Sequence, residues 1–257
     1  MTDTPPYSVS SAGIARFFSE RTINVFHVAD ISGIRAPAGR HPRDLLPSCR
    51  TMILFGIAMP DLLFSGTGRE QAEELKRLTG SLESTAFALS DLLERGGSRA
   101  IPILHSLPYT VEEGKLRGRL SLKHCAADAG FGTIGENTLF IHPDYGNRMA
   151  LAAVITDKEM EPSPPIPSLL SCTHCNKCVT ACPEGAIHDG DVDQLSCRNL
   201  TNYVPPLLRP LLWKLMRGDA SARFVTILLN QVSSRVTIRP TCSACMTACP
   251  YFHKGKR

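Results

Sequence analysis

The 257-residue sequence predicts an α/β (α+β) protein: a layered domain over residues 1–160, then a ferredoxin-like domain over residues 161–257 with two [4Fe–4S] clusters. Two observations predict this organisation. Apolar strand patterns alternate with amphipathic helix patterns as far as residue 156, as in layered α/β domains. Eight of the ten cysteines follow position 170, with the spacing of bacterial ferredoxins. The proline-rich stretch Glu161–Pro167 separates the two regions, and we take it as the domain boundary.

Each element of the first domain follows from a local pattern. A serine at position 10 or 11 can cap a helix, and short apolar runs predict strands. Glycines at positions 96, 97 and 130 are typical of helix C-termini. The predicted elements, in chain order, are a helix from Ser10 or Ser11 to about Glu20, strands Ile23–Ala29 and Thr51–Ala58, a long amphipathic helix Arg69–Glu94, a strand Ala100–Leu104, a helix Arg119–Ala129, and a hairpin that pairs Thr138–Ile141 with Met149–Thr156.

The composition is that of a soluble globular protein. Hydrophobic residues make up 43% and charged residues 20%, and there is no run of about 18 uncharged apolar residues that could form a transmembrane segment. The first residues, MTDTPPYSVS, have neither the basic region nor the apolar region of an export signal. We therefore expect a cytoplasmic protein whose cysteines are ligands or free thiols rather than disulfides.

The eight clustered cysteines form two runs, CTHCNKCVTACP at residues 172–183 and CSACMTACP at residues 242–250. The first run is the complete bacterial pattern, in which three cysteines bind one cubane and the fourth binds the other. The second run lacks its first cysteine, and Cys197 replaces it by count. A pair of zinc ribbons is the alternative, but zinc sites do not need the Cys-Pro element that occurs twice. The expected ligands are Cys172, Cys175, Cys178 and Cys249 for cluster 1, and Cys182, Cys197, Cys242 and Cys245 for cluster 2.

Between Cys197 and Cys242 the sequence predicts a helical insertion, at about residues 198–240. One face of its helix is apolar and the opposite face is basic. A basic amphipathic helix can lie on a membrane surface, but we expect this apolar stripe to pack on its own protein. The stripe comprises Leu207, Leu208, Leu211, Leu212, Leu215 and Met216, opposite Arg209, Lys214 and Arg217.

Positive charge is concentrated in the C-terminal region. Residues 198–257 hold ten Lys and Arg side chains and one acidic side chain, whereas the whole chain carries a net charge of +4. Part of this excess would neutralise the clusters, because a cubane with four thiolates carries roughly −2. The rest could attract a low-potential electron donor such as a ferredoxin or flavodoxin. Nucleic acid is an alternative partner that we do not favour.

A second informative feature is the segment Ala129–Thr138, AGFGTIGENT, which we call the glycine segment. Its glycines allow positive φ and the close approach of a large planar cofactor to the backbone. A dinucleotide loop is not indicated, because such a loop follows a strand and opens a helix, whereas this segment follows a predicted helix. By itself the segment would be only a turn, and cofactor binding by Gly130, Gly132, Thr133, Gly135 and Asn137 is implied by the resemblance described next.

Together with the cysteine runs, the stretch AGFGTIGENTLFIHPDYGNRMALAAVITD at residues 129–157 resembles epoxyqueuosine reductases and is similar to the core of the respiratory reductive dehalogenases. The segment HPRDLLPSCRTMILFGIAMP at residues 41–60 fits the same group. This resemblance implies a nitroreductase-like first domain that holds a base-off corrinoid (cobalamin), joined to a two-cluster ferredoxin-like domain. It also implies a cluster ligand at Cys197.

Three positions depart from that family. The ungapped counterpart of its proton-donating aspartate is Leu116, which cannot donate a proton. The usual tryptophan and lysine of the glycine segment are replaced by Thr133 and Glu136. We therefore carry over the clusters and the corrinoid site from the resemblance, but not the tRNA-modifying activity.

The sequence thus predicts an iron–sulfur oxidoreductase that works in a reducing, oxygen-poor setting. Electrons would pass through two [4Fe–4S] clusters to a cofactor and small-molecule substrate in the first domain. A flavin-dependent reductase and a non-catalytic electron-transfer protein or subunit are the alternatives. A nearby side chain would deliver the proton, and the candidates are His105, Tyr109, Glu112, Glu113 and His124. For each of these residues taken alone, a structural role is the preferred interpretation.

Three further residues are expected to stay outside the chemistry. Cys49 and Cys125 stand apart from the runs and are interpreted as buried apolar thiols. His174, inside the first run, is expected to face solvent, because four cysteines already complete the ligand set.

Overall fold

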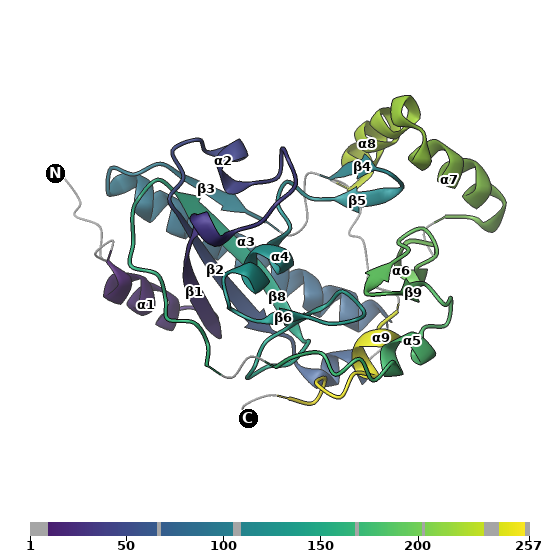
Figure 1. Cartoon of the computed structure of the whole chain (residues 1–257), viewed down its shortest axis with the longest axis horizontal. Coiled ribbons are helices and arrows are strands. Elements are labelled where there is room, and N and C mark those ends of the chain that lie inside the picture. Colours follow the sequence, from purple (N-terminus) through teal and green to yellow (C-terminus); the bar gives the residue numbers. More distant parts are fainter. Residues whose placement is uncertain are drawn as a thin grey trace.

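The computed structural model describes residues 10–65, 68–104, 109–167, 170–201, 204–233 and 242–254 (Figure 1). A four-stranded sheet in the order β1-β2-β8-β3 lies at the centre of the first domain, and each neighbouring pair is antiparallel. Its strands are β1 (Val25–Asp30), β2 (Thr51–Ala58), β8 (Met149–Thr156) and β3 (Ala100–Ile103). The predicted α/β layering is therefore confirmed.

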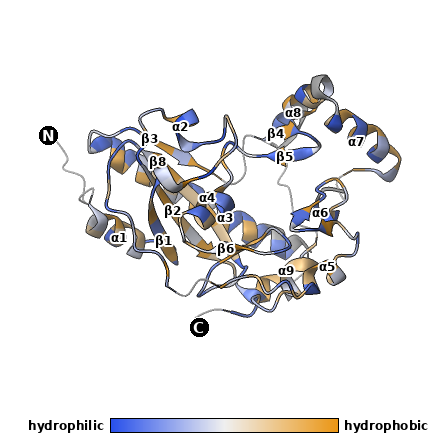
Figure 2. Cartoon of the chain, viewed as in Figure 1, coloured by the Kyte–Doolittle hydropathy of each residue, from blue (hydrophilic) through white to orange (hydrophobic). Residues whose placement is uncertain are grey.

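Helices and loops cover both faces of this sheet, which explains why β2 is apolar at almost every position. Alternate residues of a strand point to opposite faces. Leu54 packs in a core with α4 (Leu122–Asp128). The next residue, Phe55, packs in a second core with α1 (Ser11–Ser19) and α3 (Gly68–Arg95). The central strands accordingly form the most hydrophobic part of the molecule (Figure 2).

The predicted helices of the first domain are present, with small changes at their ends. The Ser10 hydroxyl accepts the Gly13 N–H at 3.2 Å and caps α1, as expected. Helix α3 ends at Arg95, and Gly97 follows with a φ of +84°, a conformation that glycine adopts without steric cost. Helix α4 begins at Leu122 rather than near Arg119, because residues 115–117 belong to a strand.

The predicted hairpin between residues 138–141 and 149–156 is wrong. The short strand β7 (Phe140–Ile141) pairs instead with β6 (Thr133–Ile134), inside and beside the glycine segment. Strand β8 lies between β2 and β3. The physical reason is burial: six of its last seven residues are buried, and only a central position in a covered sheet hides both faces of so apolar a strand.

The cysteine-rich region contains short elements and two longer helices. Figure 1 shows α7 and α8 projecting together from one end of the molecule. Helix α5 packs against α9, which brings the two cysteine runs together. The elements there are α5 (Lys177–Ala181), β9 (Ile187–His188), β10 (Asp191–Val192), α6 (Arg198–Thr201), η3 (Pro206–Leu208), α7 (Arg209–Arg217), α8 (Asp219–Ser233) and α9 (Ala244–Thr247). Elsewhere lie η1 (Ile31–Gly33), α2 (Pro42–Leu45), η2 (Asp61–Ser65), β4 (Thr110–Glu112) and β5 (Lys115–Arg117).

The apolar stripe of the helical insertion is divided. Its second half, including Leu212, Leu215 and Met216, packs in a small core with Val111 of β4 and residues of α8, as predicted. Its first half is exposed, and the exposed fractions of Leu207, Leu208 and Leu211 are 93%, 53% and 58%. Within the described residues, no helix is both long and apolar enough to span a bilayer.

Candidate functional site

The first cysteine group, Cys172, Cys175, Cys178 and Cys249, surrounds a single hollow in the structure. Three of these residues come from the loop before α5 and its first turn, and Cys249 comes from the segment after α9. In the loop, His174 and Asn176 have φ values of +49° and +56°, which are uncommon for residues other than glycine. These left-handed turns fold the loop tightly between its cysteines, and four thiols around one space suit a cubane.

The second cysteine group, Cys182, Cys197, Cys242 and Cys245, gathers beside the first. Burial, followed by the neighbouring thiols Cys197, Cys242, Cys182 and Cys178, raises the pKa of Cys245 to about 11. Burial also raises the pKa of Cys197, with Cys242 and Cys182 contributing. Four thiols held this close would repel one another once deprotonated. Bound metal ions would offset this repulsion, because they bind the thiolates and displace the protons.

The helix after Cys197 holds the second cysteine run directly. The side chain of Asn199 on α6 accepts the Cys242 N–H at 2.8 Å and donates to the Cys242 carbonyl at 3.0 Å. This pair of bonds places Cys242 next to the helix that follows Cys197, although 45 residues separate the two cysteines in the sequence. No sequence signal identified Asn199. Across the described residues, no group of three or more His, Cys, Asp or Glu side chains is arranged to hold a single metal ion.

The glycine segment forms the opposite wall of the first hollow, where Gly135, Glu136 and Asn137 line it. Two predicted cofactor residues of this segment bond to the cysteine-rich region. The Thr133 hydroxyl donates to the Leu170 carbonyl, and the Asn137 amide donates to the Cys245 carbonyl at 2.9 Å. The segment therefore contacts the cysteine-rich region through side chains that the sequence suggested for a cofactor.

Close packing and backbone conformation within the fold explain why glycine occupies these positions of the segment. A Cβ on Gly132 would lie 2.3 Å from the Phe140 ring, and one on Gly135 would lie 3.1 Å from the Asn137 side chain. Gly130 ends the turn after α4 with a φ of +72°. Close packing of the β6–β7 hairpin thus accounts for two of the three glycines, and cofactor binding by Gly130, Gly132, Thr133, Gly135 and Asn137 stays a prediction.

Glu136 links three segments at the edge of the hollow. One carboxylate oxygen lies 2.8 Å from His174 Nδ1 in the cysteine loop, and the other accepts the Gly190 N–H at 2.7 Å between β9 and β10. The side chain of His174 is 74% exposed, which agrees with the expectation that it faces solvent. Glu136 therefore fastens the cysteine loop to the glycine segment.

Three consecutive residues directly before β8 also contact the cysteine-rich end, and sequence reasoning missed them. A Cβ on Gly146 would lie 1.8 Å from the Tyr251 carbonyl oxygen. The Asn147 amide donates to the Met246 carbonyl at 2.9 Å. The Arg148 guanidinium is buried and donates to main-chain carbonyls of residues 252 and 254. The sequence signal that could have identified these contacts was an asparagine and an arginine directly before an apolar strand.

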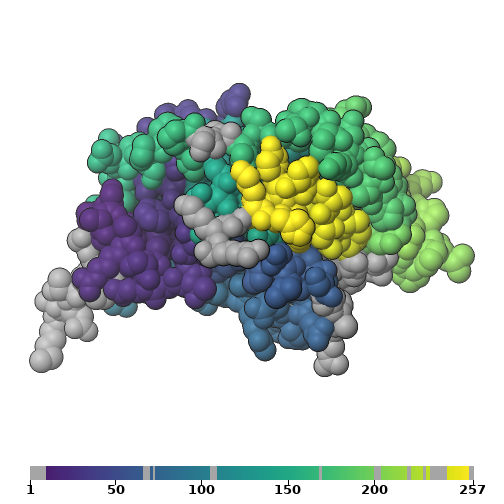
Figure 3. All heavy atoms as spheres, turned by 90° about the horizontal axis from the view of Figure 1, so that it is seen from below, coloured from purple at the N-terminus to yellow at the C-terminus, as the bar shows by residue number. Residues whose placement is uncertain are grey.

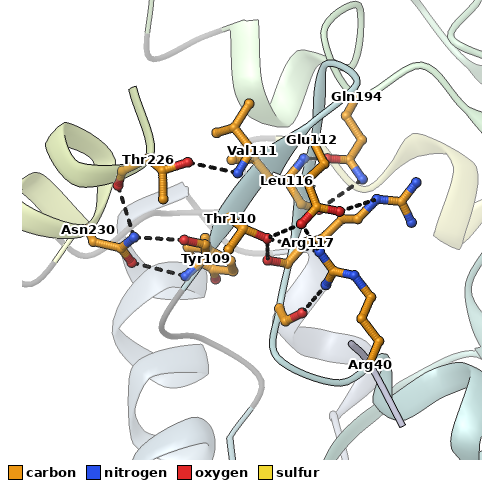
Figure 4. A network of polar contacts seen from close by, with 11 residues as sticks. Arg40, Tyr109, Thr110, Val111, Glu112, Leu116, Arg117, Gln194, Thr226 and Asn230 are labelled. Carbon is orange, nitrogen blue, oxygen red and sulfur yellow. Dashed lines mark hydrogen bonds and ion pairs between the residues drawn. The ribbon is translucent and has the colours of Figure 1, made fainter. Parts of the chain in front are cut away.

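Most proton-donor candidates lie on one hairpin, β4–β5 (Figure 4). Tyr109 precedes β4 and Glu112 ends it. The turn is formed by Glu113 and Gly114, whose φ values of +52° and +76° suit a two-residue hairpin loop. Glu113 is exposed there. His124 lies elsewhere, exposed on α4 with Nδ1 2.5 Å from the Ser121 hydroxyl, and His105 lies outside the described residues.

Residues from other segments hold this hairpin in place (Figure 4). The Thr226 hydroxyl on α8 accepts the Val111 N–H at 2.9 Å, and the Gln194 side chain accepts the Leu116 N–H at 2.9 Å. The Leu116 side chain packs against the small core under the helical insertion. Leu116 is therefore part of a hydrophobic contact.

The hairpin candidates differ in protonation. Arg40 donates to a Glu112 oxygen at 2.5 Å, and this bond is the main cause that lowers the pKa of Glu112. Burial, with a smaller contribution from Glu83, raises the pKa of Tyr109. At neutral pH Tyr109 therefore keeps a proton that it could donate, whereas Glu112 does not.

Cys49 and Cys125 are buried thiols in the first domain, as expected. Burial is the main cause that raises the pKa of each to about 11. Neither belongs to a cysteine group, and a protonated thiol is a poor nucleophile.

Comparison with known proteins supports this arrangement. Residues 168–188 match the 4Fe-4S binding domain family. The chain is 30% identical to epoxyqueuosine reductase of Bacillus subtilis (strain 168) over 218 residues, which cover 84% of this chain and 50% of that protein. It is 30% identical to epoxyqueuosine reductase of Listeria monocytogenes over 135 residues, which cover 52% and 30% of the two chains. The chain thus spans half or less of the length of these two curated relatives.

Solved structures show the same likeness in the fold. The chain matches epoxyqueuosine reductase from Streptococcus thermophilus with a TM-score of 0.61 and 18% identity, over 96% of this chain and 67% of that one. It matches the Bacillus subtilis epoxyqueuosine reductase, in a structure described with its catalytic loop swung out of the active site, with a TM-score of 0.60 and 20% identity, over 95% and 65%. A catabolic reductive dehalogenase matches with a TM-score of 0.51 and 16% identity, over 82% and 34%. The predicted resemblance is confirmed in sequence and in fold.

Proposed function

We propose that this chain is an iron–sulfur oxidoreductase that relays electrons through two [4Fe–4S] clusters to an acceptor in its first domain. One observation carries the proposal: the hollow lined by Cys172, Cys175, Cys178 and Cys249 is closed on its other side by Gly135–Asn137 of the glycine segment. A cluster bound there would lie against the first domain. The second cysteine group would hold the other cluster beside it, since α5 packs against α9.

The positions of the two cysteine groups suggest a route for the electrons. A low-potential donor such as a ferredoxin or flavodoxin would dock on the cysteine-rich domain, whose excess of Lys and Arg side chains attracts an acidic partner. Burial and hydrogen bonds to the thiolate sulfurs set the potential of each cluster. The Ala186 N–H, 3.3 Å from Cys182 Sγ, is one such bond in the second group.

A corrinoid is the acceptor that the family resemblance suggests, and it would supply a metal centre that takes up electrons in the first domain. The residues available to it are limited in this chain. Thr133 and Asn137 already bond to main-chain carbonyls, and Gly132 is required by the Phe140 ring. These contacts do not point to a corrinoid by themselves, so its binding rests on the resemblance, and a flavin remains an alternative acceptor.

Tyr109 is the best candidate for proton delivery among the described residues that the sequence suggested. Its phenol is protonated at neutral pH, and burial raises its pKa further above the ordinary value of tyrosine. Tyr109 directly precedes β4, and the partner strand β5 carries Leu116, the position that the resemblance sets against the family's acid. We propose that it replaces that acid, and a Tyr109→Phe variant should then lose turnover while it keeps its clusters.

Anaerobic purification followed by metal analysis tests the proposal. We expect about eight iron atoms per chain, as two cubanes require. Cobalt near one equivalent after incubation with cobalamin would support a corrinoid reductase, and flavin absorption would support a flavin enzyme. Iron and sulfide alone, with no uptake of either cofactor, would indicate an electron-transfer protein. Iron far below about eight would exclude the two-cluster site.

Nucleic acid is the alternative partner. One structure to which this chain is similar, with a TM-score of 0.59, is described as a complex with an epoxyqueuosine-modified tRNA stem loop. In this chain Leu116 stands at the aligned position of the family's acid, so we do not propose the same reaction. Salt-dependent binding of a tRNA stem loop, absent for unrelated RNA, would reverse that judgement.

A further inference from the structure

Arg148 is a buried cation at the junction of the two domains. Its side chain precedes β8, and the residue is only 7% exposed. Nε donates to the Phe252 carbonyl at 2.5 Å, Nη2 donates to the Lys254 carbonyl at 2.9 Å, and Nη1 donates to the Met59 carbonyl. The guanidinium also lies 5.6 Å from the centre of the Phe252 ring. The side chain thus fastens the end of the cysteine-rich region to the first domain.

All of these partners are uncharged. Among the described residues, no carboxylate lies within ion-pair distance of Arg148. An arginine guanidinium keeps its charge under all conditions in which proteins fold. A buried charge without an opposite charge is costly, even when its hydrogen bonds are made. An anion near Arg148 would offset this cost.

The segment that Arg148 binds is the one that supplies Cys249. The Phe252 N–H donates to the Cys249 carbonyl at 2.9 Å, so the residue gripped by Arg148 closes a turn on a predicted cluster ligand. Asn147, its neighbour, donates to the Met246 carbonyl in α9. Figure 3 shows residues 242–254, in yellow, lodged between the green residues of the first cysteine run and the blue and teal residues of the first domain.

We propose that the [4Fe–4S] cluster completed by Cys249 is the missing anion, and that Arg148 is a positioning residue that raises the reduction potential of this cluster. A cubane with four thiolates carries roughly −2, and one further electron makes it more negative. A nearby buried cation stabilises the reduced form more than the oxidised form, because the attraction grows with the charge on the cluster. This inference rests on the proposed function, since it requires a cluster in the first cysteine group.

The experiment compares Arg148→Lys, which keeps a positive charge, with Arg148→Met, which removes it. Both substitutions remove the planar fork that reaches residues 252 and 254 together. Lys keeps a charged N–H donor and Met has neither, so the comparison reports on the charge and the single hydrogen bond that it can make. Arg50→Met is the control, because Arg50 is an exposed arginine paired with Glu159. The readouts are the midpoint potentials from anaerobic titrations followed by electron paramagnetic resonance, and the rate of iron release to a chelator.

We expect the midpoint potential of one cluster to be more negative in Arg148→Met than in Arg148→Lys, and to be unchanged in Arg50→Met. Iron release should be faster in Arg148→Met than in Arg148→Lys. If Arg148→Met is too unstable for a potential titration, the rate of iron release tests the proposal instead. Equal potentials, or equal iron loss, in the two Arg148 variants would overturn the proposal. Arg148 would then only hold the C-terminal segment in place through its hydrogen bonds. Iron missing from the unmutated protein would instead reject the cluster assignment itself.

Discussion

Asn230 forms a two-bond bridge to the backbone of Tyr109. Its Nδ2 donates to the Tyr109 carbonyl at 2.7 Å, and its Oδ1 accepts the Tyr109 N–H at 3.0 Å (Figure 4). A single side chain of the helical insertion thus satisfies both polar groups of a residue 121 positions earlier. The insertion between the cysteine runs therefore supports the hairpin that carries the proton-donor candidates of the first domain.

Replacing Asn230 with alanine should loosen this hairpin. The change leaves two partly buried backbone groups without partners, which costs about 1–3 kcal/mol per group if water does not replace them. Hydrogen exchange measured by mass spectrometry should become faster over residues 109–117 and stay unchanged in β2 and β8. Arg223→Ala, at an exposed position on the same helix, is the control. Unchanged exchange in the hairpin of the Asn230 variant would show that the bridge does not hold it.

Two glycines with positive φ should respond differently to alanine. Gly146 has a φ of +60° and a Cβ there would meet the Tyr251 carbonyl, whereas Gly39 has a φ of +77° and no atom within 4 Å. Both variants strain the backbone by a similar amount, but only Gly146→Ala also pushes away the segment after Cys249. We expect lower retained iron and faster proteolysis of the C-terminal segment in Gly146→Ala alone. Equal behaviour of the two variants would mean that this close contact is unimportant.

Cysteine substitution separates ligands from buried thiols. Cys197→Ser should lose about four of about eight irons per chain, because a [4Fe–4S] cluster needs its fourth thiolate. Cys125→Ser, in the core of the first domain, should keep its full iron content even if its stability falls. Iron analysis together with absorption near the cluster bands measures both. Full iron content in the Cys197 variant would remove this residue from the ligand set.

The pKa values of Cys49 and Cys125 predict a pH-dependent reactivity. Burial raises both to about 11, so at pH 8 these thiols stay protonated in the folded protein. Iodoacetamide should therefore label them only when the chain unfolds or when the pH approaches about 11, detected by peptide mass spectrometry. Since the folded state holds these protons more tightly than the unfolded state, stability should decrease as the pH rises from about 8.5 towards that value. Rapid labelling of either cysteine at pH 8 in folded protein would contradict the burial.

Sequence patterns predicted the local elements of the first domain well, because those elements follow from side chains near one another. Strand β2 matches its predicted bounds of Thr51–Ala58, and α1 begins at the predicted serine cap. The hairpin after the glycine segment was predicted wrongly for the opposite reason. An apolar strand such as β8 carries no mark of which strand it will pair with, and burial between β2 and β3 decided the pairing.

By itself, the sequence determined the presence and spacing of the cysteines, the helices and strands around them, and the resemblance to epoxyqueuosine reductases. The sequence also predicted that Cys249 joins Cys172, Cys175 and Cys178, but only the tertiary structure placed Glu136 and Asn137 on the other wall of their hollow. It alone buried Arg148 without a carboxylate partner among the described residues. The physical reason is that thiol spacing and apolar periodicity are local, whereas charge compensation and shared cavities depend on residues that meet only after the chain has folded.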